Sequence, residues 1–466
     1  MGAWQKTIVK GEELMDLCVK NGKIVSGDSI ISGNLYIDKG KVAFVTAEEI
    51  PEIQVDTVVD AKGNYVIPGV VDPHVHGGWG EPDRENYTCA GKAAAAGGVT
   101  TLMEQPLSYP PTATPEAFLD KKKAGEEQFV VDFSLWGGLI PGHLDDMKEI
   151  YKLGGGAFKS FMCRCSNYPS TNDGQLVKGM QKLAEFGGLS AVHAENDTLI
   201  QELVDEFNAA GKTDAKAYLE SHPPYSELEA IQRYILIAEQ APGCKAHVVH
   251  CSIPEGVWAI TNAKLRGVDI TVETCPQYLA LCHDDLYEKG GVAKCDPPVR
   301  SREDVEKMWD LLKAGRIDMV TSDHSPHPFV KKVVPLEDFP KAAEGVTGLQ
   351  TMLPVMLTEG VHKRGLPLLQ LIQLMCVNTA KRFGVWGRKG ALLPGFDGDF
   401  VILDLNAEYL CKAEDMYYLN KHTPYDGKTM KGKVLSTWVR GKKVYEDGKI
   451  TAEPGYGRFC PMNMGG

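Results

Sequence analysis

Several apolar segments of this chain end in side chains that can bind metal ions. One segment ends in D-P-H-V-H, and because side chains along a strand alternate between its two faces, His74 and His76 point the same way and can chelate one cation. Three further apolar segments end at His193, His250 and Asp323. These residue types favour a site that holds divalent cations.

A single histidine at the end of a strand is more often a hydrogen-bonded structural residue than a metal ligand. Here an H-x-H pair, two further histidines and an aspartate stand at the matching ends of four segments. Chance placement is a poor explanation of the whole set. We therefore interpret the five residues as one site.

One lysine lies within an otherwise apolar segment, G-G-G-A-F-K-S-F-M at 154–162. A buried lysine is costly unless its charge is removed or paired, which leaves two interpretations of Lys159 open. Carbamylation by carbon dioxide would turn its amine into an anionic carboxylate able to bridge two cations. The alternative is an ordinary ion pair with an acidic neighbour.

The elements that carry these residues predict an α/β protein, a (β/α)8 TIM barrel. Short apolar segments alternate with stretches such as 226–240 and 302–313, whose apolar residues recur every three or four positions, as in helices that cover a sheet. In a barrel the catalytic groups come from the C-terminal ends of several strands, where these metal-capable residues fall. The eight candidate strands, the number that closes a barrel, are 66–76, 100–105, 131–137, 157–162, 189–195, 246–252, 269–274 and 318–323.

Both ends of the chain are rich in short strands with tight turns, which predicts a small β-sandwich domain formed by both termini. Residues 1–65 would supply its N-terminal half, and residues 391–466 its C-terminal half and a tail. Residues 66–390 would form the barrel between them.

Composition excludes several classes of protein. Hydrophobic residues make up 43% and charged residues 24% of the 466, which is typical of a globular protein and not of a disordered one. The net charge of -12 supplies none of the basic surface that nucleic acid or anionic lipid needs. The N-terminal residues show no apolar stretch long enough for a signal peptide or a membrane span.

The 12 cysteines are scattered, without the dense spacing of a secreted disulfide scaffold. Reduced thiols are the simpler interpretation, and we expect a cytoplasmic protein. Cys163 and Cys165 form the closest pair. A C-x-C motif alone is weak support for a soft-metal site, and two ordinary small residues after a strand are the alternative.

The chain resembles the cyclic amidohydrolases of the amidohydrolase superfamily, which include hydantoinases, allantoinases, dihydropyrimidinases and dihydroorotases. The resemblance covers nearly the whole chain, and its motifs occur in the family's order and spacing. They are I-P-G-V-V-D-P-H-V-H at 67–76, A-G-G-V-T-T at 96–101, F-K-S-F-M at 158–162, V-H-A-E-N at 192–196, E-T-C-P-Q-Y-L at 273–279, D-P-P-V-R at 296–300 and S-D-H-S-P at 322–326.

The resemblance implies a site with two divalent cations, usually zinc, and it assigns a role to each ligand. His74 and His76 would hold the first cation together with Asp323, and His193 and His250 would hold the second. Lys159, carbamylated to N6-carboxylysine, would bridge both. Asp323 would also act as general base and then general acid while activated water opens the ring. Relatives are commonly homotetramers, so a homo-oligomer is expected by analogy.

Departures from the family's patterns narrow the substrate. Dihydroorotases usually carry an arginine two residues after H-x-H, where this chain has Gly78, and dihydropyrimidinases a tyrosine five residues after the bridging lysine, where it has Arg164. Segments 104–114, 131–134 and 345–350 resemble the allantoinase and L-hydantoinase branch. The resemblance thus implies opening of a hydantoin-type ring, allantoin to allantoate or a 5-substituted hydantoin to its N-carbamoyl amino acid. The alternative is a dihydropyrimidinase.

Substrate contacts are less well defined than metal ligands. The family's usual histidine in its C-P-H-Y stretch is Gln277 here, so a contact copied from that histidine is in doubt. A second class of function is a non-catalytic relative that has lost its ligands, but all six expected metal-site residues are present. The candidates near the side pocket are Trp79, Arg164, Asn167, Cys275 and Asn378.

Overall fold

The computed structural model describes residues 14–51, 53–165 and 168–465. All eight predicted barrel strands are present, and the third is divided into two. They are β6 (Val70–Val75), β7 (Val99–Glu104), β8 (Asp132–Leu135), β9 (Gly137–Gly138), β10 (Ala157–Phe161), β11 (Leu189–His193), β12 (Lys245–Val248), β13 (Ile270–Thr274) and β14 (Met319–Val320). Their pairing is parallel throughout, which confirms the predicted fold class.

Two parallel sheets make up the barrel, in the orders β6-β7-β8 and β14-β13-β12-β11-β10-β9. The last strand returns to the first just beyond β14, where the amide of His76 donates to the carbonyl of His324 at 2.8 Å and Val75 forms a bridge with His324. Every residue of β6, β7, β10 and β11 is buried, as expected of parallel strands that are covered on both faces.

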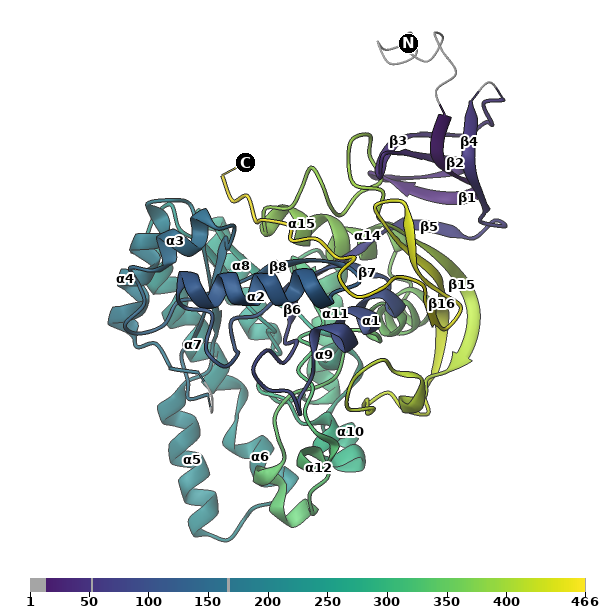
Figure 1. Ribbon diagram of the computed structural model, residues 1–466. Coiled ribbons are helices and arrows are strands. Elements are labelled where there is room, and N and C mark those ends of the chain that lie inside the picture. The colour runs from purple at the N-terminus through teal and green to yellow at the C-terminus, as the bar shows by residue number, and fades with distance from the viewer. Residues whose placement is uncertain (1–13, 52, 166–167, 466) are drawn as a thin grey trace.

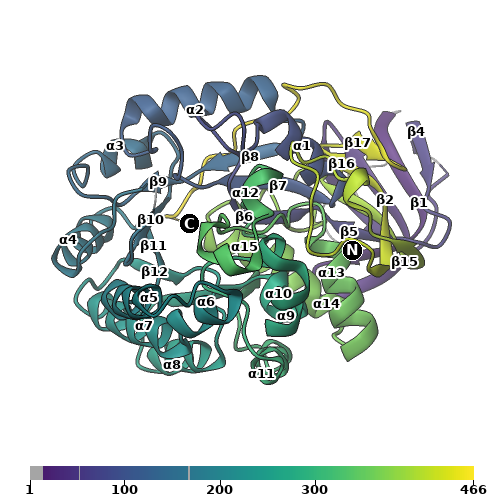
Figure 2. The same ribbon diagram turned by 90° about the horizontal axis from the view of Figure 1, so that it is seen from below.

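Helices cover the outside of the barrel, and α2, α4, α7, α8 and α11 lie around its strands in Figure 2. The predicted helices at 226–240 and 302–313 correspond to α7 and α11. The helices are α1 (Tyr87–Ala96), α2 (Pro115–Gln128), α3 (Met147–Lys152), α4 (Asp173–Ala184), α5 (Asp197–Ala209), α6 (Ala215–Ser221), α7 (Pro224–Ala238), α8 (Pro254–Leu265), α9 (Pro276–Ala280), α10 (His283–Lys289), α11 (Arg302–Lys313), α12 (Phe329–Lys332), α13 (Met352–Met356), α14 (Leu368–Ile372) and α15 (Asn378–Arg382). No helix in the described part of the chain is long and apolar enough to cross a membrane.

A nine-stranded sheet unites the two ends of the chain (Figure 1). Its order is β18-β17-β16-β15-β5-β1-β2-β3, with β4 paired to β1, and β5 joins the two halves by antiparallel pairing with β15. This confirms that both termini build one small β domain. Its strands are β1 (Leu14–Ser26), β2 (Ser29–Asp38), β3 (Lys41–Thr46), β4 (Gln54–Asp60), β5 (Tyr65–Pro68), β15 (Phe400–Leu410), β16 (Thr429–Val439), β17 (Lys442–Glu446) and β18 (Lys449–Ile450).

The segment predicted as the first barrel strand, 66–76, changes sheets at Gly69. Residues before it pair with β15, and the amide of Gly69 donates to the carbonyl of Asp399 at 3.0 Å. The next amide, from Val70, donates to Gly98 in the barrel. A Cβ at position 69 would lie 2.0 Å from Oγ1 of Thr100, so the chain can pass between the two sheets here only as glycine. The domain boundaries at 65/66 and 390/391 stay a prediction.

The C-terminal tail returns to the barrel. Phe459 forms a bridge with Phe133 of β8, and the amide of Cys460 donates to the Phe133 carbonyl at 2.7 Å. Nearby, the buried Lys389 ion-pairs with Asp132 of β8 and with Asp399 at the start of β15, at 2.5 and 2.7 Å. The small β domain and the barrel are therefore held together by buried charges as well as by chain connections.

Candidate metal centre and active site

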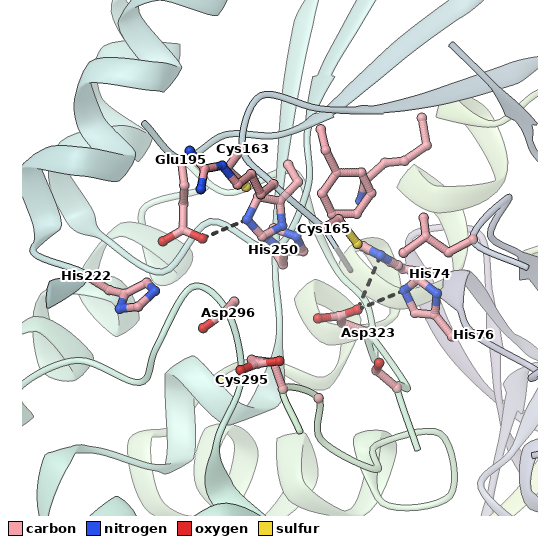
Figure 3. Close-up of a pocket in the computed structure, with 18 of the residues that line it drawn as sticks. His74, His76, Cys163, Cys165, Glu195, His222, His250, Cys295, Asp296 and Asp323 are labelled. Carbon is pink, nitrogen blue, oxygen red and sulfur yellow. Dashed lines mark hydrogen bonds and ion pairs between the residues drawn. The ribbon is translucent and has the colours of Figure 1, made fainter. Parts of the chain in front are cut away.

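A cavity of about 270 Å³ opens at the C-terminal ends of the barrel strands (Figure 3). Most of its metal-capable lining comes from residues at or just beyond a strand end, as barrel enzymes arrange their active sites. All six metal-site residues that the sequence predicts line this cavity, namely His74, His76, Lys159, His193, His250 and Asp323.

One side of the cavity gathers three ligand atoms around a single point. Nε2 of His74 lies 3.3 Å and Nε2 of His76 lies 3.5 Å from Oδ1 of Asp323, and Figure 3 shows the carboxylate facing both rings. Nε2 of His74 is buried and has no hydrogen-bond partner among the described residues. A buried polar atom of this kind is rare in proteins, and a cation at this point would satisfy it. The residues present therefore fit a metal ion.

The other side of the cavity is formed by His193 and His250, whose ring centroids are 4.6 Å apart. Nε2 of His193 lies 2.7 Å from Oε2 of Glu195, which leaves Nδ1 as the ring atom available to a cation. Nδ1 of His250 is buried and has no hydrogen-bond partner in the described ranges of the chain. Burial, together with the charges of His193 and Lys159, holds the pKa of His250 well below its usual value, so the ring is neutral and able to act as a ligand.

Lys159 lies between the two sides, on β10, with only 1% of its surface exposed. Burial lowers the pKa of its amine to about 8, although the charges of Asp323 and Glu273 act in the opposite direction. Among the residues that the structure describes, no carboxylate lies within ion-pairing distance of this amine. A lysine with a lowered pKa and no ion-pair partner is suited to carbamylation, because the neutral amine is the form that adds carbon dioxide.

Asp323 is placed to handle protons. Burial alone would raise its pKa, but the neighbouring His74, His76 and Lys159 outweigh burial and hold the pKa of the carboxyl below its usual range. The side chain is therefore an ionised carboxylate that can accept a proton.

Two of the predicted ligands have strained backbones. The φ angle is 39° at His250 and 44° at Asp323, and both lie in the left-handed region that favours glycine. Such a residue costs about 1–3 kcal/mol, and it persists where the surrounding structure enforces it. The strain falls on the residues just after β12 and β14, where a ligand must turn from the strand direction into the cavity.

A buried chain of hydrogen bonds runs from His74 into the barrel interior. Nδ1 of His74 is hydrogen-bonded to Oε1 of Glu273, and Oε2 of the same carboxylate lies 3.1 Å from Nε2 of His247. Nδ1 of His247 in turn meets Oγ1 of Thr271 at 2.8 Å. The sequence showed Glu273 only as part of a motif. Glu273 stands two residues after Thr271 on the same strand, so both side chains point to the same face. That spacing was the available sequence signal for a contact in the barrel interior.

Arg164 is the predicted substrate residue that lines the cavity. Its side chain is 68% exposed, Nε ion-pairs with Asp197 at 3.1 Å and Nη1 donates to Gln201 at 2.7 Å. Asn167 lies outside the described residues.

The remaining substrate candidates are used elsewhere, and none of them is among the described residues that line the cavity. Cys275 is fully buried with Sγ 3.6 Å from Oγ1 of Thr321, and Trp79 stacks on Tyr87. Asn378 donates to the carbonyl of Asp318 at 2.7 Å, at the opposite end of β14 from Asp323. The structure therefore gives no support to Trp79, Cys275 or Asn378 as substrate contacts.

Several cavity residues had no predicted role. Asp296 is half-buried on the wall and accepts a hydrogen bond from the hydroxyl of Tyr218. At the opening, Arg84 donates to the carbonyl of Pro326 and to Oγ of Ser325, both at 2.7 Å. Asp296 stands in the D-P-P-V-R motif, whereas nothing in the sequence singled out Arg84. Glu195, Cys163 and His222 also line the cavity.

A barrel with histidine, lysine and aspartate ligands at its strand ends defines a class of metal-dependent hydrolases. The chain belongs to the amidohydrolase family, whose model matches residues 65–444. The family that the sequence motifs predicted is therefore confirmed, and with it a metal-dependent enzyme.

Individual relatives narrow the comparison. The chain is 40% identical to an L-hydantoinase of Paenarthrobacter aurescens, covering 96% of this chain and 98% of the relative. It is 39% identical to an allantoinase of Rubrobacter xylanophilus, covering 95% and 97%. A solved structure described as an L-hydantoinase (dihydropyrimidinase) from Arthrobacter aurescens superimposes with a TM-score of 0.94 at 40% identity, covering 96% of this chain and all of that one.

Proposed function

We propose that this chain opens a hydantoin-type ring by hydrolysis, converting allantoin to allantoate or a 5-substituted hydantoin to its N-carbamoyl amino acid. Hydrolysis of a cyclic amide is what the family and the names of its relatives have in common. The observation that carries the proposal is the convergence of six metal-capable side chains on one cavity. A dihydropyrimidinase, which opens dihydrouracil-type rings, is the alternative.

The six residues would hold two divalent cations, which we take to be zinc. His74, His76 and Asp323 form one set of ligands, and His193 and His250 form the other. Lys159, as N6-carboxylysine, would bridge the two sets, which suits a buried amine with no ion-pair partner among the residues that the structure describes. Bound there, the cations would supply the Lewis acidity that polarises the ring carbonyl and acidifies the attacking water.

Asp323 would move the proton. Its ionised carboxylate accepts a proton from the water that attacks the ring carbonyl, and it then donates that proton to the ring nitrogen as the carbon–nitrogen bond breaks. His74 and His76 hold this carboxylate in place. Each turnover consumes one water molecule and breaks one carbon–nitrogen bond of the ring.

Gly78 and Arg164 support the hydantoin branch over the other rings of the family. An anionic dihydroorotate would lack the expected arginine at position 78, and a dihydropyrimidine would lack the expected tyrosine at position 164. Arg164 lines the cavity. We propose it as a partner of the ureido group of allantoin.

The proposal also covers the cellular compartment, the oligomeric state and the partners of the enzyme. None of the 12 cysteines, all of which lie in the described part of the chain, forms a disulfide bond, which supports a reducing compartment and therefore the cytoplasm. A homotetramer is proposed from the resemblance to cyclic amidohydrolases. The substrate is a small molecule, and the acidic net charge of -12 disfavours nucleic-acid and membrane partners.

The test is a set of initial rates on allantoin, unsubstituted hydantoin, a 5-aryl hydantoin and dihydrouracil, measured side by side with zinc-reconstituted enzyme. Preference for allantoin or the aryl hydantoin supports the proposal and identifies the substituent. Faster opening of dihydrouracil establishes the alternative instead. Activity that survives full chelation contradicts the metal centre, and a protein inactive on every ring even with zinc contradicts the enzyme.

An arginine variant separates allantoin from other hydantoins. Arg164→Ala should lower kcat/KM for allantoin by about tenfold, the scale of one lost charge-assisted hydrogen bond, and leave that for unsubstituted hydantoin unchanged. Arg233→Ala is the matched control, because Arg233 also pairs with acidic residues, Asp173 and Glu229, but lies outside the cavity.

A further inference from the structure

Cys163 belongs to a cluster that the proposed metal pair does not explain. Its Sγ, a ring nitrogen of His193 and a carboxylate oxygen of Glu195 lie within 4.8 Å of one another. The exposed fractions of the three residues are 8%, 5% and 2%. In Figure 3 Cys163 and Glu195 lie together on the side of the cavity opposite His76. Cys163, the first cysteine of the C-x-C motif, therefore lies in a cluster with a histidine and a glutamate.

Glu195 has an oxygen with no partner. Oε2 is hydrogen-bonded to Nε2 of His193 at 2.7 Å, but Oε1 is buried and makes no hydrogen bond within the described part of the chain. An unsatisfied carboxylate oxygen in the interior is costly, and it is an unusual feature in a native structure. A cation beside Cys163 would satisfy it.

We propose that Cys163, His193 and Glu195 bind one thiophilic divalent cation, such as Zn²⁺ or Cd²⁺, at a third site that inhibits the enzyme. Zn²⁺ takes sulfur, nitrogen and oxygen ligands, and three protein ligands leave its fourth position open to water, which the cavity can supply here. On binding, the Cys163 thiol and the Nε2–H of His193 each give a proton to solvent, so that a thiolate and an imidazolate nitrogen take the cation. Soft thiolate favours Zn²⁺ and Cd²⁺ over Mg²⁺ and Mn²⁺, which prefer oxygen ligands.

Inhibition follows from the sharing of His193. The third cation would take Nε2 from Glu195, so the carboxylate would no longer orient the ring whose Nδ1 we assign to the proposed pair. It would also add positive charge beside the ring of His193, whose centroid lies 4.6 Å from that of His250. Binding at the third site stands on its own geometry, whereas the inhibitory effect rests on the proposed function.

Cadmium titration tests the site with two independent readouts. Purified enzyme with its own metals is titrated with Cd²⁺ while the ultraviolet absorption of the thiolate–cadmium bond and the rate of ring opening are recorded. We expect one equivalent per chain to produce the absorption and to lower the rate by at least about tenfold. Mg²⁺ and Mn²⁺ should produce neither effect.

Two variants assign the thiol. Cys163→Ser should lose both the absorption and the inhibition, each judged against the variant's own rate without Cd²⁺. Cys165→Ser, which changes the neighbouring thiol of the C-x-C motif, should keep both. Glu195→Gln retains the thiol and should weaken Cd²⁺ binding about tenfold, so it tests the site if Cys163→Ser does not fold.

Other outcomes overturn the proposal. An absorption that persists in Cys163→Ser, or that is lost only in Cys165→Ser, assigns the cation to another thiol. Inhibition without the absorption shows exchange at the proposed pair instead of a third site. Because the absorption does not depend on turnover, a protein that opens none of the tested rings but binds Cd²⁺ through Cys163 would contradict the proposed function and retain the third site.

Discussion

Nδ1 of His74 and Oε1 of Glu273 are hydrogen-bonded in the barrel interior, and neither side chain reaches solvent. The hydrogen bond fixes the tautomer of His74, because the proton must lie on Nδ1 and the lone pair of Nε2 must face Asp323. Burial would raise the pKa of Glu273, but His74 and His247 outweigh it and hold the pKa below its usual range. A fixed negative charge thus lies beneath the proposed first cation.

Replacing this charge should weaken cation binding. Glu273→Gln keeps the size of the side chain but removes the charge, so we expect the affinity for the first cation to fall by about 10–100-fold. Metal content after dialysis against buffered free Zn²⁺, measured by atomic emission, checks this. Glu227→Gln is the matched control, since Glu227 is also buried but pairs with Arg300 and Ser252. Equal zinc retention in the two variants would show that Glu273 only packs.

Lys159→Ala should lose metal as well as activity, because it removes the proposed bridge. Short carboxylic acids such as acetate or propionate should partly restore both, since they can occupy the place of the carbamate. Lys121→Ala removes another buried lysine, which ion-pairs with Glu104 at 3.4 Å, and the acids should not rescue that variant. Full metal occupancy in Lys159→Ala would contradict the bridging role.

The lowered pKa of Lys159 makes carbamylation sensitive to pH in a defined range. Only the neutral amine adds carbon dioxide, and with a pKa of about 8 the neutral fraction rises steeply below pH 8 and levels off above it. Metal-free enzyme at constant dissolved ¹³C-carbon dioxide should therefore form carbamate about five times faster at pH 8 than at pH 7, as measured by NMR. Little further gain is expected above pH 9. A rate that still rises about eightfold from pH 9 to pH 10 would indicate an ordinary lysine with its usual pKa.

Asp323→Asn should abolish proton transfer while it preserves shape. We expect kcat to fall by at least about 100-fold, the lower end for loss of a general base. Asp318→Asn is the control at the other end of β14, where Asp318 ion-pairs with Lys264 at 2.5 Å, and its kcat should stay near that of the parent. Stopped assays on allantoin or the preferred hydantoin give both values. An active Asp323→Asn enzyme would require another base.

Sequence periodicity was sufficient to predict the barrel because its strands are short, apolar and separated by amphipathic helices. It could not show that 66–76 changes sheets at Gly69, since the new partners, Asp399 and Gly98, are distant in sequence. It also missed the division of the third strand into β8 and β9. Local patterns predict that a strand exists, and long-range hydrogen bonds decide which sheet it joins.

The candidate site shows the same limit. Strand ends predicted the residues that line the cavity, because alternation along a strand fixes the direction of each side chain. Cys275 is not among the described residues that line the cavity. It lies between the end of β13 at Thr274 and the start of α9 at Pro276, so strand alternation does not fix the direction of its side chain. The partners of His74 and His193, which are Glu273 and Glu195, needed the folded barrel to show what they touch.

The nine-stranded sheet is built from both ends of the chain, so it can be completed only late in synthesis. β1 to β5 leave the ribosome first, but β5 finds its antiparallel neighbour β15 only after residues 69–399 have been synthesised. At about 5–20 residues per second that interval lasts tens of seconds. During this time Phe400 and Trp438 are not yet present to pack against the inner face of the early strands, which includes Val19, Ile24 and Val66. Burial of this apolar face therefore depends on strands that are synthesised last.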